Sequence, residues 1–247
     1  MDSCAQGIYK IKPKTKVKKR ENNIMQIKIA PSILSANFCF MGEAVQNLER
    51  CGADLIHCDV MDGTFVGPIT FGGQMVKNIR HLTKLPLDVH LMIEHPKTQI
   101  KFFADAGADI ITVHYQACAK ISPTYLKETL ELIKSYGVKC GVVINPDVDV
   151  EKIYDVFPLC DMVLLMSVFP GYGGQKFIEP VIEKVKKARE YAISIGMPEL
   201  DIEIDGGVTE ENAPEIIKAG ANVLVAGSTV FKSTDMAKTI KTLKGQA

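Results

Sequence analysis

A histidine and two carboxylates follow directly on an apolar segment of the chain, in the sequence His57-Cys58-Asp59-Val60-Met61-Asp62-Gly63. Burying an unpaired charge costs a large free energy, so a buried strand is expected to end in such residues only where they have a function. His57 and Asp59 are two positions apart and therefore project from the same face of a strand. We expect this pair to bind a metal ion, Cys58 to point away into the packing, and Asp62 to shape the following turn.

Two more metal-ligand residues end later apolar segments. His90 lies in Asp88-Val89-His90-Leu91-Met92, and Asp205 lies directly before two glycines. With His57 and Asp59 they offer two imidazoles and two carboxylates, a set that suits one divalent cation such as Zn²⁺, Fe²⁺, Mn²⁺ or Co²⁺. His114 also ends an apolar segment, and we interpret it as a polar residue at the rim of the site.

Glycine-rich segments follow three of the later apolar runs and predict a phosphate site. They are Phe169-Pro170-Gly171-Tyr172-Gly173-Gly174-Gln175, Gly206-Gly207 and Ala226-Gly227-Ser228. Glycine lets backbone N–H groups approach an anion closely, and a helix N-terminus adds its dipole. One such loop could be an ordinary turn, but three around one site favour an anion.

The elements that must position these residues alternate strictly from residue 25 onward. The expected strands are Lys28–Leu34, Ala53–Met61, Leu87–Met92, Ile110–His114, Lys139–Ile144, Met162–Met166, Asp201–Ile204 and Asn222–Ala226. Amphipathic segments between them include Met41–Arg50, Thr98–Asp105, Leu126–Ser135, Ile178–Ser194 and Glu211–Lys218. This alternation predicts parallel strands that are joined by helices.

A repeated pattern gives the number of units. Gly52, Gly107 and Gly220 each follow a helical segment and precede a strand, and their spacings are near two and four units of about 28 residues. Eight such units make a (β/α)8 TIM barrel, which has its active site at the C-terminal ends of the strands. An open doubly wound sheet is the alternative, but no Gly-x-Gly-x-x-Gly follows the first strand.

Composition indicates one large α/β domain over residues 25–247. The chain has 247 residues, is 47% hydrophobic and carries no net charge. It has no apolar run of about 18 residues, so no membrane span is expected. Its seven cysteines are expected to be reduced thiols of a cytoplasmic protein.

Residues 1–24 are strongly basic, with seven Lys and Arg residues against Asp2 and Glu21. We expect a disordered extension without a specific function. The alternatives are an arm for nucleic acid or membranes, or a targeting peptide. Met25 directly precedes the first strand, so a further hypothesis is that translation starts there.

A metal ion beside two carboxylates suits proton abstraction next to a carbonyl group, through an enediolate. If Asp59 and Asp205 stood on opposite faces of the substrate, one could remove a proton and the other could return one, which is epimerisation. No lysine ends a predicted strand, which argues against Schiff-base chemistry.

The chain resembles the ribulose-phosphate 3-epimerase family over about residues 27–231. The resemblance lies in Pro31-Ser32-Ile33-Leu34-Ser35-Ala36, His57-x-Asp59-Val60-Met61-Asp62-Gly63, Asp88-Val89-His90-Leu91-Met92, Pro170-Gly171-Tyr172-Gly173-Gly174-Gln175, Asp205-Gly206-Gly207 and Ala226-Gly227-Ser228. It implies metal-dependent epimerisation at C3, from D-ribulose 5-phosphate to D-xylulose 5-phosphate, in the pentose phosphate pathway. The enzyme would be an isomerase.

The resemblance also implies roles for individual residues. Asp59 would accept the proton and Asp205 would donate one, and one metal ion per subunit would be held by His57, Asp59, His90 and Asp205. The implied substrate-binding residues are Ser32, His90, Gly171, Tyr172, Gly173, Gly174, Asp205, Gly206, Gly207, Gly227 and Ser228. Met61, Met92 and Met166 would form an apolar wall. Three positions, Pro68, Phe169 and Tyr172, depart from the family pattern and lie on loops beside the site.

Other functions stay open from the sequence. A hexulose-6-phosphate 3-epimerase, for example one acting on allulose 6-phosphate, would use the same chemistry on a longer sugar. A metal-free decarboxylase would need a lysine between Asp59 and Asp62, which is absent. A non-catalytic phosphate-binding barrel is the remote alternative. We expect a sugar-phosphate ligand, no nucleic acid or membrane partner, and a homo-oligomer.

Overall fold

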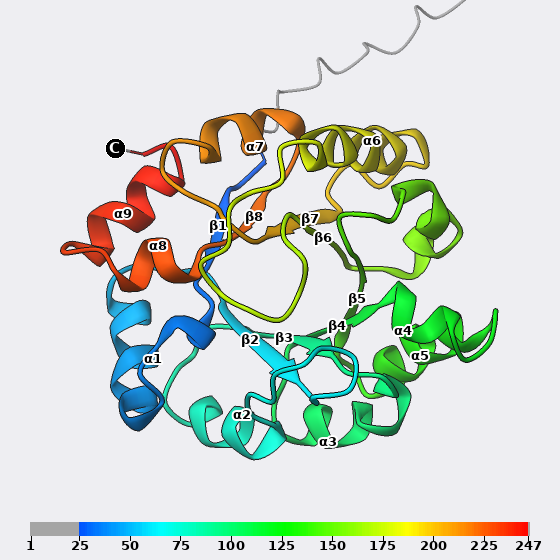
Figure 1. The fold of residues 1–247 in the computed structure, drawn as a ribbon, viewed down its shortest axis with the longest axis horizontal. Coiled ribbons are helices and arrows are strands. Elements are labelled where there is room, and N and C mark those ends of the chain that lie inside the picture. Colours follow the sequence, from blue (N-terminus) through cyan, green and yellow to red (C-terminus); the bar gives the residue numbers. More distant parts are fainter. Residues whose placement is uncertain (1–24, 247) are drawn as a thin grey trace, which may run out of the picture.

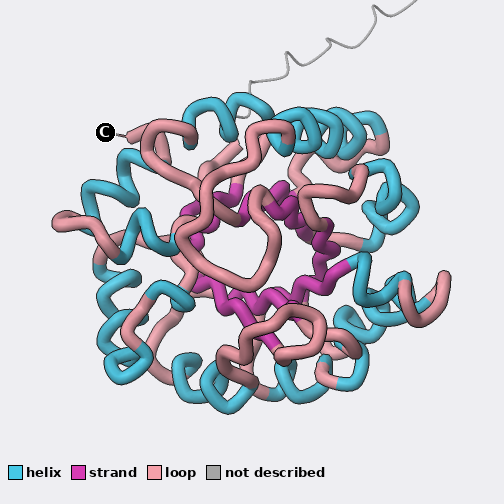
Figure 2. The backbone as a smooth tube through the Cα atoms, in the orientation of Figure 1, coloured by secondary structure: helices cyan, strands magenta, loops and turns pink. Residues whose placement is uncertain are grey.

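Eight parallel strands surround a central axis, and helices cover the outside of this ring (Figures 1 and 2). The computed structural model describes residues 25–246, so the predictions for the basic segment 1–24 lie outside it. The strands follow the order β1-β8-β7-β6-β5-β4-β3-β2. A bridge between Ser32 and His57 brings the two end strands together, and the predicted (β/α)8 barrel is confirmed.

All eight predicted strands are present. They are β1 (Lys28–Ala30), β2 (Ile56–Met61), β3 (Leu87–Met92), β4 (Ile110–His114), β5 (Lys139–Ile144), β6 (Met162–Met166), β7 (Asp201–Asp205) and β8 (Val223–Val225). The bounds of β3 to β6 agree with the prediction. Strand β1 is shorter than predicted, because Pro31 has no N–H to donate and the Ser32 side chain caps a 3-10 turn at Ile33–Ser35.

The outer layer contains the predicted helices and several that the sequence analysis did not identify. The α-helices of the described residues are α1 (Met41–Arg50), α2 (Gly73–Arg80), α3 (Ile100–Asp105), α4 (Tyr115–Ala119), α5 (Tyr125–Ser135), α6 (Val181–Ser194), α7 (Ala213–Ala219), α8 (Gly227–Phe231) and α9 (Met236–Leu243). Between β5 and β6, a 3-10 segment, Val150–Leu159, takes the place of an α-helix and contains Pro158. Gly220 ends α7 with φ 117°, as the repeated pattern predicts.

Alternation along β2 explains how the barrel positions polar side chains. Ile56, Cys58 and Val60 pack in the main apolar core. The residues between them, His57 and Asp59, therefore point into the barrel, where both are buried. The prediction that Cys58 belongs to the packing is confirmed. Among residues 25–246, none of the helices has the length and apolar character needed to span a membrane.

Candidate active site at the carboxyl ends of the strands

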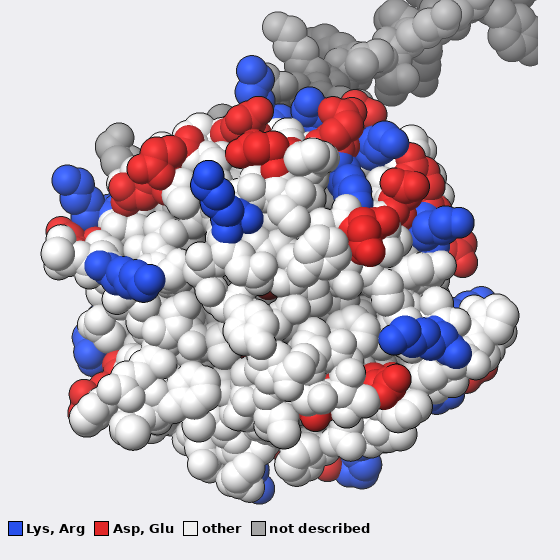
Figure 3. Space-filling model, viewed as in Figure 1, with Lys and Arg blue, Asp and Glu red and all other residues white. Residues whose placement is uncertain are grey.

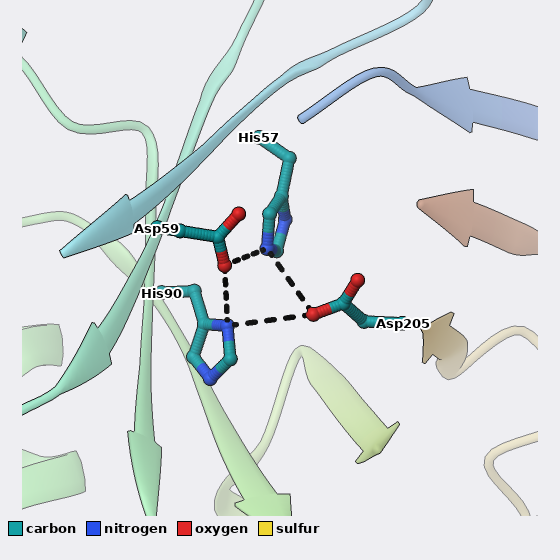
Figure 4. Close-up of side chains that lie close together, drawn as sticks. All are labelled: His57, Asp59, His90 and Asp205. Atoms are coloured by element: carbon teal, nitrogen blue, oxygen red, sulfur yellow. Dashed lines mark hydrogen bonds and ion pairs between the residues drawn. The ribbon is translucent and has the colours of Figure 1, made fainter. Parts of the chain in front are cut away.

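Four side chains from three strands converge inside the mouth of the barrel (Figure 4). His57 and Asp59 come from β2, His90 from β3 and Asp205 from β7. Asp59 Oδ1 lies 3.3 Å from His57 Nε2 and 3.2 Å from His90 Nδ1. Asp205 Oδ2 lies 4.0 Å and 3.9 Å from the same two nitrogens. The structure thus brings together all four predicted metal ligands.

The spacing of these atoms fits a single divalent cation. Ligands about 2.0–2.1 Å from a tetrahedral Zn²⁺ ion lie about 3.3 Å from one another. The separations of Asp59 from the two nitrogens, 3.3 and 3.2 Å, agree with this value, and those of Asp205, 4.0 and 3.9 Å, are longer. His57 Nε2 is buried and has no hydrogen-bond partner within residues 25–246. Because a buried, unpartnered nitrogen is costly, its position facing two carboxylates is best explained as a ligand position.

The two carboxylates have different environments. Burial would raise the pKa of Asp59, but the charges of His57 and His90 and their close polar contacts with Asp59 outweigh it and hold this pKa well below its ordinary value. Burial and the nearby charge of Asp59 raise the pKa of Asp205 to about 6. Asp59 therefore stays ionised, whereas Asp205 can carry a proton, which is the arrangement that an acid–base pair needs.

Two further carboxylates lie beneath His57 and were missed by the sequence analysis. Asp88 Oδ2 lies 2.6 Å from His57 Nδ1, and Glu203 Oε1 lies 3.7 Å from the same nitrogen. Both side chains are fully buried. Burial and the charge of Asp88 raise the pKa of Glu203 well above its ordinary value. A sequence signal existed, because Asp88 and Glu203 each precede a predicted ligand by two residues and so share its face of the strand.

The carboxylate of Asp88 determines which nitrogen of His57 faces the site. A carboxylate accepts a hydrogen bond from Nδ1–H, and this leaves Nε2 as the nitrogen with a free lone pair. Nε2 is also the nitrogen that faces Asp59 and Asp205. Asp88 therefore orients the ring of His57, a predicted metal ligand. The sequence analysis did not identify this role of Asp88.

The prediction for His114 is wrong. Its side chain is fully buried, and its Nε2 atom lies 2.8 Å from Nε2 of His90, so it is not a polar rim residue. The ring of Phe65, from the loop after β2, covers it with a distance of 4.6 Å between ring centroids. No pattern in the sequence indicates that this loop folds over the end of β4.

One cavity above the four ligands contains nearly all of the predicted substrate-binding residues. Its lining includes Ser32, Asp59 and Asp205, the loop 171–174, and the residues Gly206, Gly207, Gly227 and Ser228. Met61, Met92 and Met166 line the same cavity. His90 is absent from this lining because it lies deeper, with no exposed surface. The Ser32 hydroxyl donates a hydrogen bond to Asp59 Oδ2.

The loop between β6 and α6 crosses the mouth of the barrel (yellow-green in Figure 1). Gln175 Nε2 holds it by donating to the carbonyl oxygens of Phe169 and Tyr172, at 2.7 and 2.8 Å. Gly207 supports it from the next strand: its φ is 64°, and an added Cβ would lie 2.5 Å from Phe177 N. Glycine is therefore required at 207 for conformation and for space.

Asp62 shapes the turn after β2, as predicted. Its Oδ1 accepts hydrogen bonds from the backbone N–H groups of Thr64 and Phe65, both at 2.8 Å. Its Oδ2 accepts one from the N–H of Glu94 at 2.9 Å. These bonds anchor the loop that carries Phe65 over His114 and leave Asp62 outside the set of ligands.

The centre of the face in Figure 3 carries few charged side chains, and lysine and arginine residues lie mainly toward its edges. An anion bound in the central cavity would therefore be held mostly by backbone N–H groups of the glycine-rich segments and by Ser228. This arrangement agrees with the phosphate site that those segments predict.

Comparisons with known proteins place the chain among epimerases. The model of the ribulose-phosphate 3 epimerase family matches residues 28–231. The ribulose-phosphate 3-epimerase of Bacillus subtilis is 52% identical over 219 residues, which are 89% of this chain and 99% of that protein. The chloroplastic ribulose-5-phosphate-3-epimerase of Arabidopsis thaliana is 49% identical over 216 residues, which are 87% of this chain and 75% of that protein.

Solved structures support the fold at lower sequence identity. A mutant tryptophan synthase alpha-subunit of Pyrococcus furiosus gives a TM-score of 0.64 at 16% identity, over 90% of this chain and 99% of that one. A 3-hexulose-6-phosphate synthase gives a TM-score of 0.59 at 16% identity, with the same coverage. At this identity, the similarity concerns the barrel alone.

Proposed function

The chain belongs to the ribulose-phosphate 3-epimerase family, and from that premise we propose that Asp59 and Asp205 are the residues that move the proton at C3. The enzyme is an isomerase that interconverts D-ribulose 5-phosphate and D-xylulose 5-phosphate. One observation supports this assignment most strongly: two carboxylates face the same two imidazoles, and their pKa values are driven in opposite directions.

The two carboxylates divide the work of proton transfer. Asp59, which stays ionised, removes the C3 proton and leaves an enediolate. Asp205 then delivers a proton to the other face of C3, and the roles exchange in the reverse direction. Strands β1 and β8 lie between β2 and β7 in the barrel, so the carboxylates approach the cavity from different sides. The side chain of Asp205 is 14% exposed and can renew its proton from water.

The same residues would hold a divalent metal ion. His57, Asp59, His90 and Asp205 supply two nitrogen and two oxygen donors, which suit Zn²⁺, Fe²⁺, Mn²⁺ or Co²⁺. When bound, the ion supplies a Lewis acid that polarises the carbonyl group and stabilises negative charge on the substrate oxygens. We propose one such ion per subunit.

The cavity lining gives the other proposed contacts. Ser32 would orient the sugar next to Asp59, and His90, which lies deeper, would act on the substrate only through Asp59 and the metal ion. The loop 171–174, together with Gly206, Gly207, Gly227 and Ser228, would bind the substrate and its phosphate group through backbone N–H groups. Met61, Met92 and Met166 would exclude water from the reacting carbon.

A comparison of two substrates tests the proposed preference for a pentose. We expect a higher kcat/KM for D-ribulose 5-phosphate than for D-allulose 6-phosphate with the same metal-loaded protein. Higher efficiency on the hexulose phosphate would show that this chain is the longer-sugar epimerase instead. Metal analysis of the same preparation would identify the ion and its stoichiometry.

The assembly and location of the protein belong to the same proposal. The exposed aromatic side chains of Phe38, Phe40 and Phe102 support a homo-oligomer, which light scattering after size-exclusion chromatography would measure. The six cysteines within residues 25–246 are free thiols, which supports a cytoplasmic location.

A further inference from the structure

His90 and His114 meet edge to edge inside the barrel, at the ends of the neighbouring strands β3 and β4. Their Nε2 atoms lie 2.8 Å apart, and both side chains are fully buried. The ring centroids are 5.0 Å apart and the ring planes differ by 22°. The two nitrogens therefore lie between nearly coplanar rings, which is the geometry of a nitrogen-to-nitrogen hydrogen bond.

This geometry requires one proton between the two rings. Two lone pairs that faced each other at 2.8 Å without water would repel, and so would two N–H groups. Either His90 donates to His114, or His114 donates to His90. The choice matters because a neutral imidazole carries one proton, so a proton on His90 Nε2 leaves its Nδ1 lone pair free. Nδ1 is the His90 nitrogen that faces Asp59 and Asp205. Without a metal it can donate to Asp59, 3.2 Å away, but to bind a metal between these groups it must give up its proton, and the proton of neutral His90 is then on Nε2.

The far side of the His114 ring favours the first arrangement. His114 Nδ1, both polar atoms of the Gln116 amide and Asn145 Oδ1 are buried, and none has a hydrogen-bond partner among the residues that the structure describes. The side chains of Asn145 and Gln116 both lie close to the His114 ring. Two of these three amide atoms are oxygens, which can only accept, whereas the one nitrogen can only donate, so the surroundings favour a proton on His114 Nδ1. Neutral His114 then has its lone pair on Nε2 and accepts from His90.

We propose that His114 is a positioning residue, which accepts a hydrogen bond from His90 Nε2–H and so keeps His90 Nδ1 available as a metal ligand. The inference rests on the metal site proposed above. His57 presents the other ring nitrogen to the site: its Nε2 faces Asp59, and its Nδ1 lies next to Asp88. The two imidazole ligands thus present different nitrogens, each selected by the partner behind it.

Replacement of His114 tests this role through metal affinity rather than activity. His114→Leu removes the acceptor, so His90 can place its proton on Nδ1 and no longer bind a metal there. His114→Gln is the matched control, because the glutamine side chain is long enough to place an acceptor oxygen near the position of Nε2. Co²⁺ titration of the metal-free proteins, followed by visible absorption, gives the affinity and the geometry of the site.

We expect Co²⁺ affinity to fall about 10–100-fold in His114→Leu and to stay within about threefold of wild type in His114→Gln. Equal affinity in wild type and a folded His114→Leu would overturn the inference while leaving the metal site intact. Equal losses in the leucine and glutamine variants would also overturn it, because the acceptor would then not matter. Failure of the wild-type protein to bind Co²⁺ would instead overturn the proposed metal site, and the inference with it.

A second measurement uses the wild-type protein and needs only the His114→Gln variant, for the assignment of signals. Correlation spectra of ¹⁵N-histidine-labelled, Zn²⁺-loaded protein report which nitrogen of each neutral imidazole carries the proton. The His114→Gln spectrum identifies the His114 signals by their absence. We expect a proton on Nδ1 of His114 and on Nε2 of His90. A proton on Nε2 of His114 would overturn the inference.

Discussion

The carboxylates of Asp59 and Asp205 face the same two imidazoles, but their pKa values are shifted in opposite directions. Asp59 lies nearer to both nitrogens, at 3.3 and 3.2 Å, than Asp205 does, at 4.0 and 3.9 Å. Asp59 also accepts a hydrogen bond from Ser32. Because of this asymmetry, Asp59 stays ionised while Asp205 takes up a proton more readily.

Asp205→Asn should abolish catalysis and metal binding together. The amide cannot transfer a proton, so we expect kcat to fall by at least about 10²–10⁴-fold. In the wild type, a metal ion at 100 times its Kd should add about 2.7 kcal/mol to the free energy of unfolding, and we expect most of this gain to be lost in the variant. Thermal melts with and without added metal measure it. Asp201→Asn, at the start of the same strand and paired with Lys28, is the control and should retain activity.

Metal affinity should weaken as the pH falls through about 6. The pKa of Asp205 in the metal-free protein is raised to about 6, so below this pH a proton competes with the metal. A raised carboxyl pKa stabilises the metal-free fold fully below the ordinary value of 3.8, and this stabilisation is lost as the pH rises through about 6. Stabilisation by the metal should therefore be largest above pH 6. Calorimetric titrations at pH 5, 6 and 7 check this, and equal affinities would contradict it.

Removal of the Asp88 carboxylate should loosen the metal site without touching a ligand. Asp88→Leu deprives His57 Nδ1 of its partner, and we expect metal affinity to fall about 10–100-fold. Asp88→Asn keeps an acceptor oxygen and should lose much less. Competition with a chelator of known affinity measures both variants. A leucine variant that binds metal as tightly as the wild type would show that Asp88 does not orient His57.

The site residues that could be predicted from the sequence are those that follow from the alternation of side chains along a strand. The i, i+2 rule brought His57 and Asp59 to one face, and the same rule applied to His90 and Asp205 would have found Asp88 and Glu203. His114 could not be placed correctly, because its burial depends on a loop that carries Phe65 from another strand. Contacts between loops distant in the chain leave no periodic signal in the sequence.

The same holds for the secondary structure: elements set by a local apolar pattern were predicted correctly, and those that depend on other interactions were not. Strands β3 to β6 were predicted to the residue because each is a short apolar run. The end of β1 was wrong because Pro31 and the Ser32 cap override the apolar pattern that continues to Leu34. The 3-10 segment Val150–Leu159 was not predicted, since its apolar residues suit several kinds of helix.

Gly207→Ala should disturb the loop over the cavity. An alanine there would combine a left-handed φ of 64° with a Cβ 2.5 Å from Phe177 N, so the loop must shift. We expect a stability loss of at least about 1 kcal/mol and a higher KM for the sugar phosphate. Gly173→Ala is the matched control for stability, because its added Cβ meets only Ser35 Oγ, at 3.8 Å. Similar stability losses in both variants would contradict this account.

Proton transfer by two separate carboxylates is tested most directly by epimerisation of D-ribulose 5-phosphate in D₂O, with both sugars analysed at early times by mass spectrometry. If Asp59 removes the C3 proton and Asp205 delivers another, each new molecule of D-xylulose 5-phosphate should carry one deuteron at C3. The unreacted D-ribulose 5-phosphate should remain unlabelled at these times. Product that keeps the original proton, or substrate that is labelled as fast as product, would mean that one group serves both faces and would contradict the account.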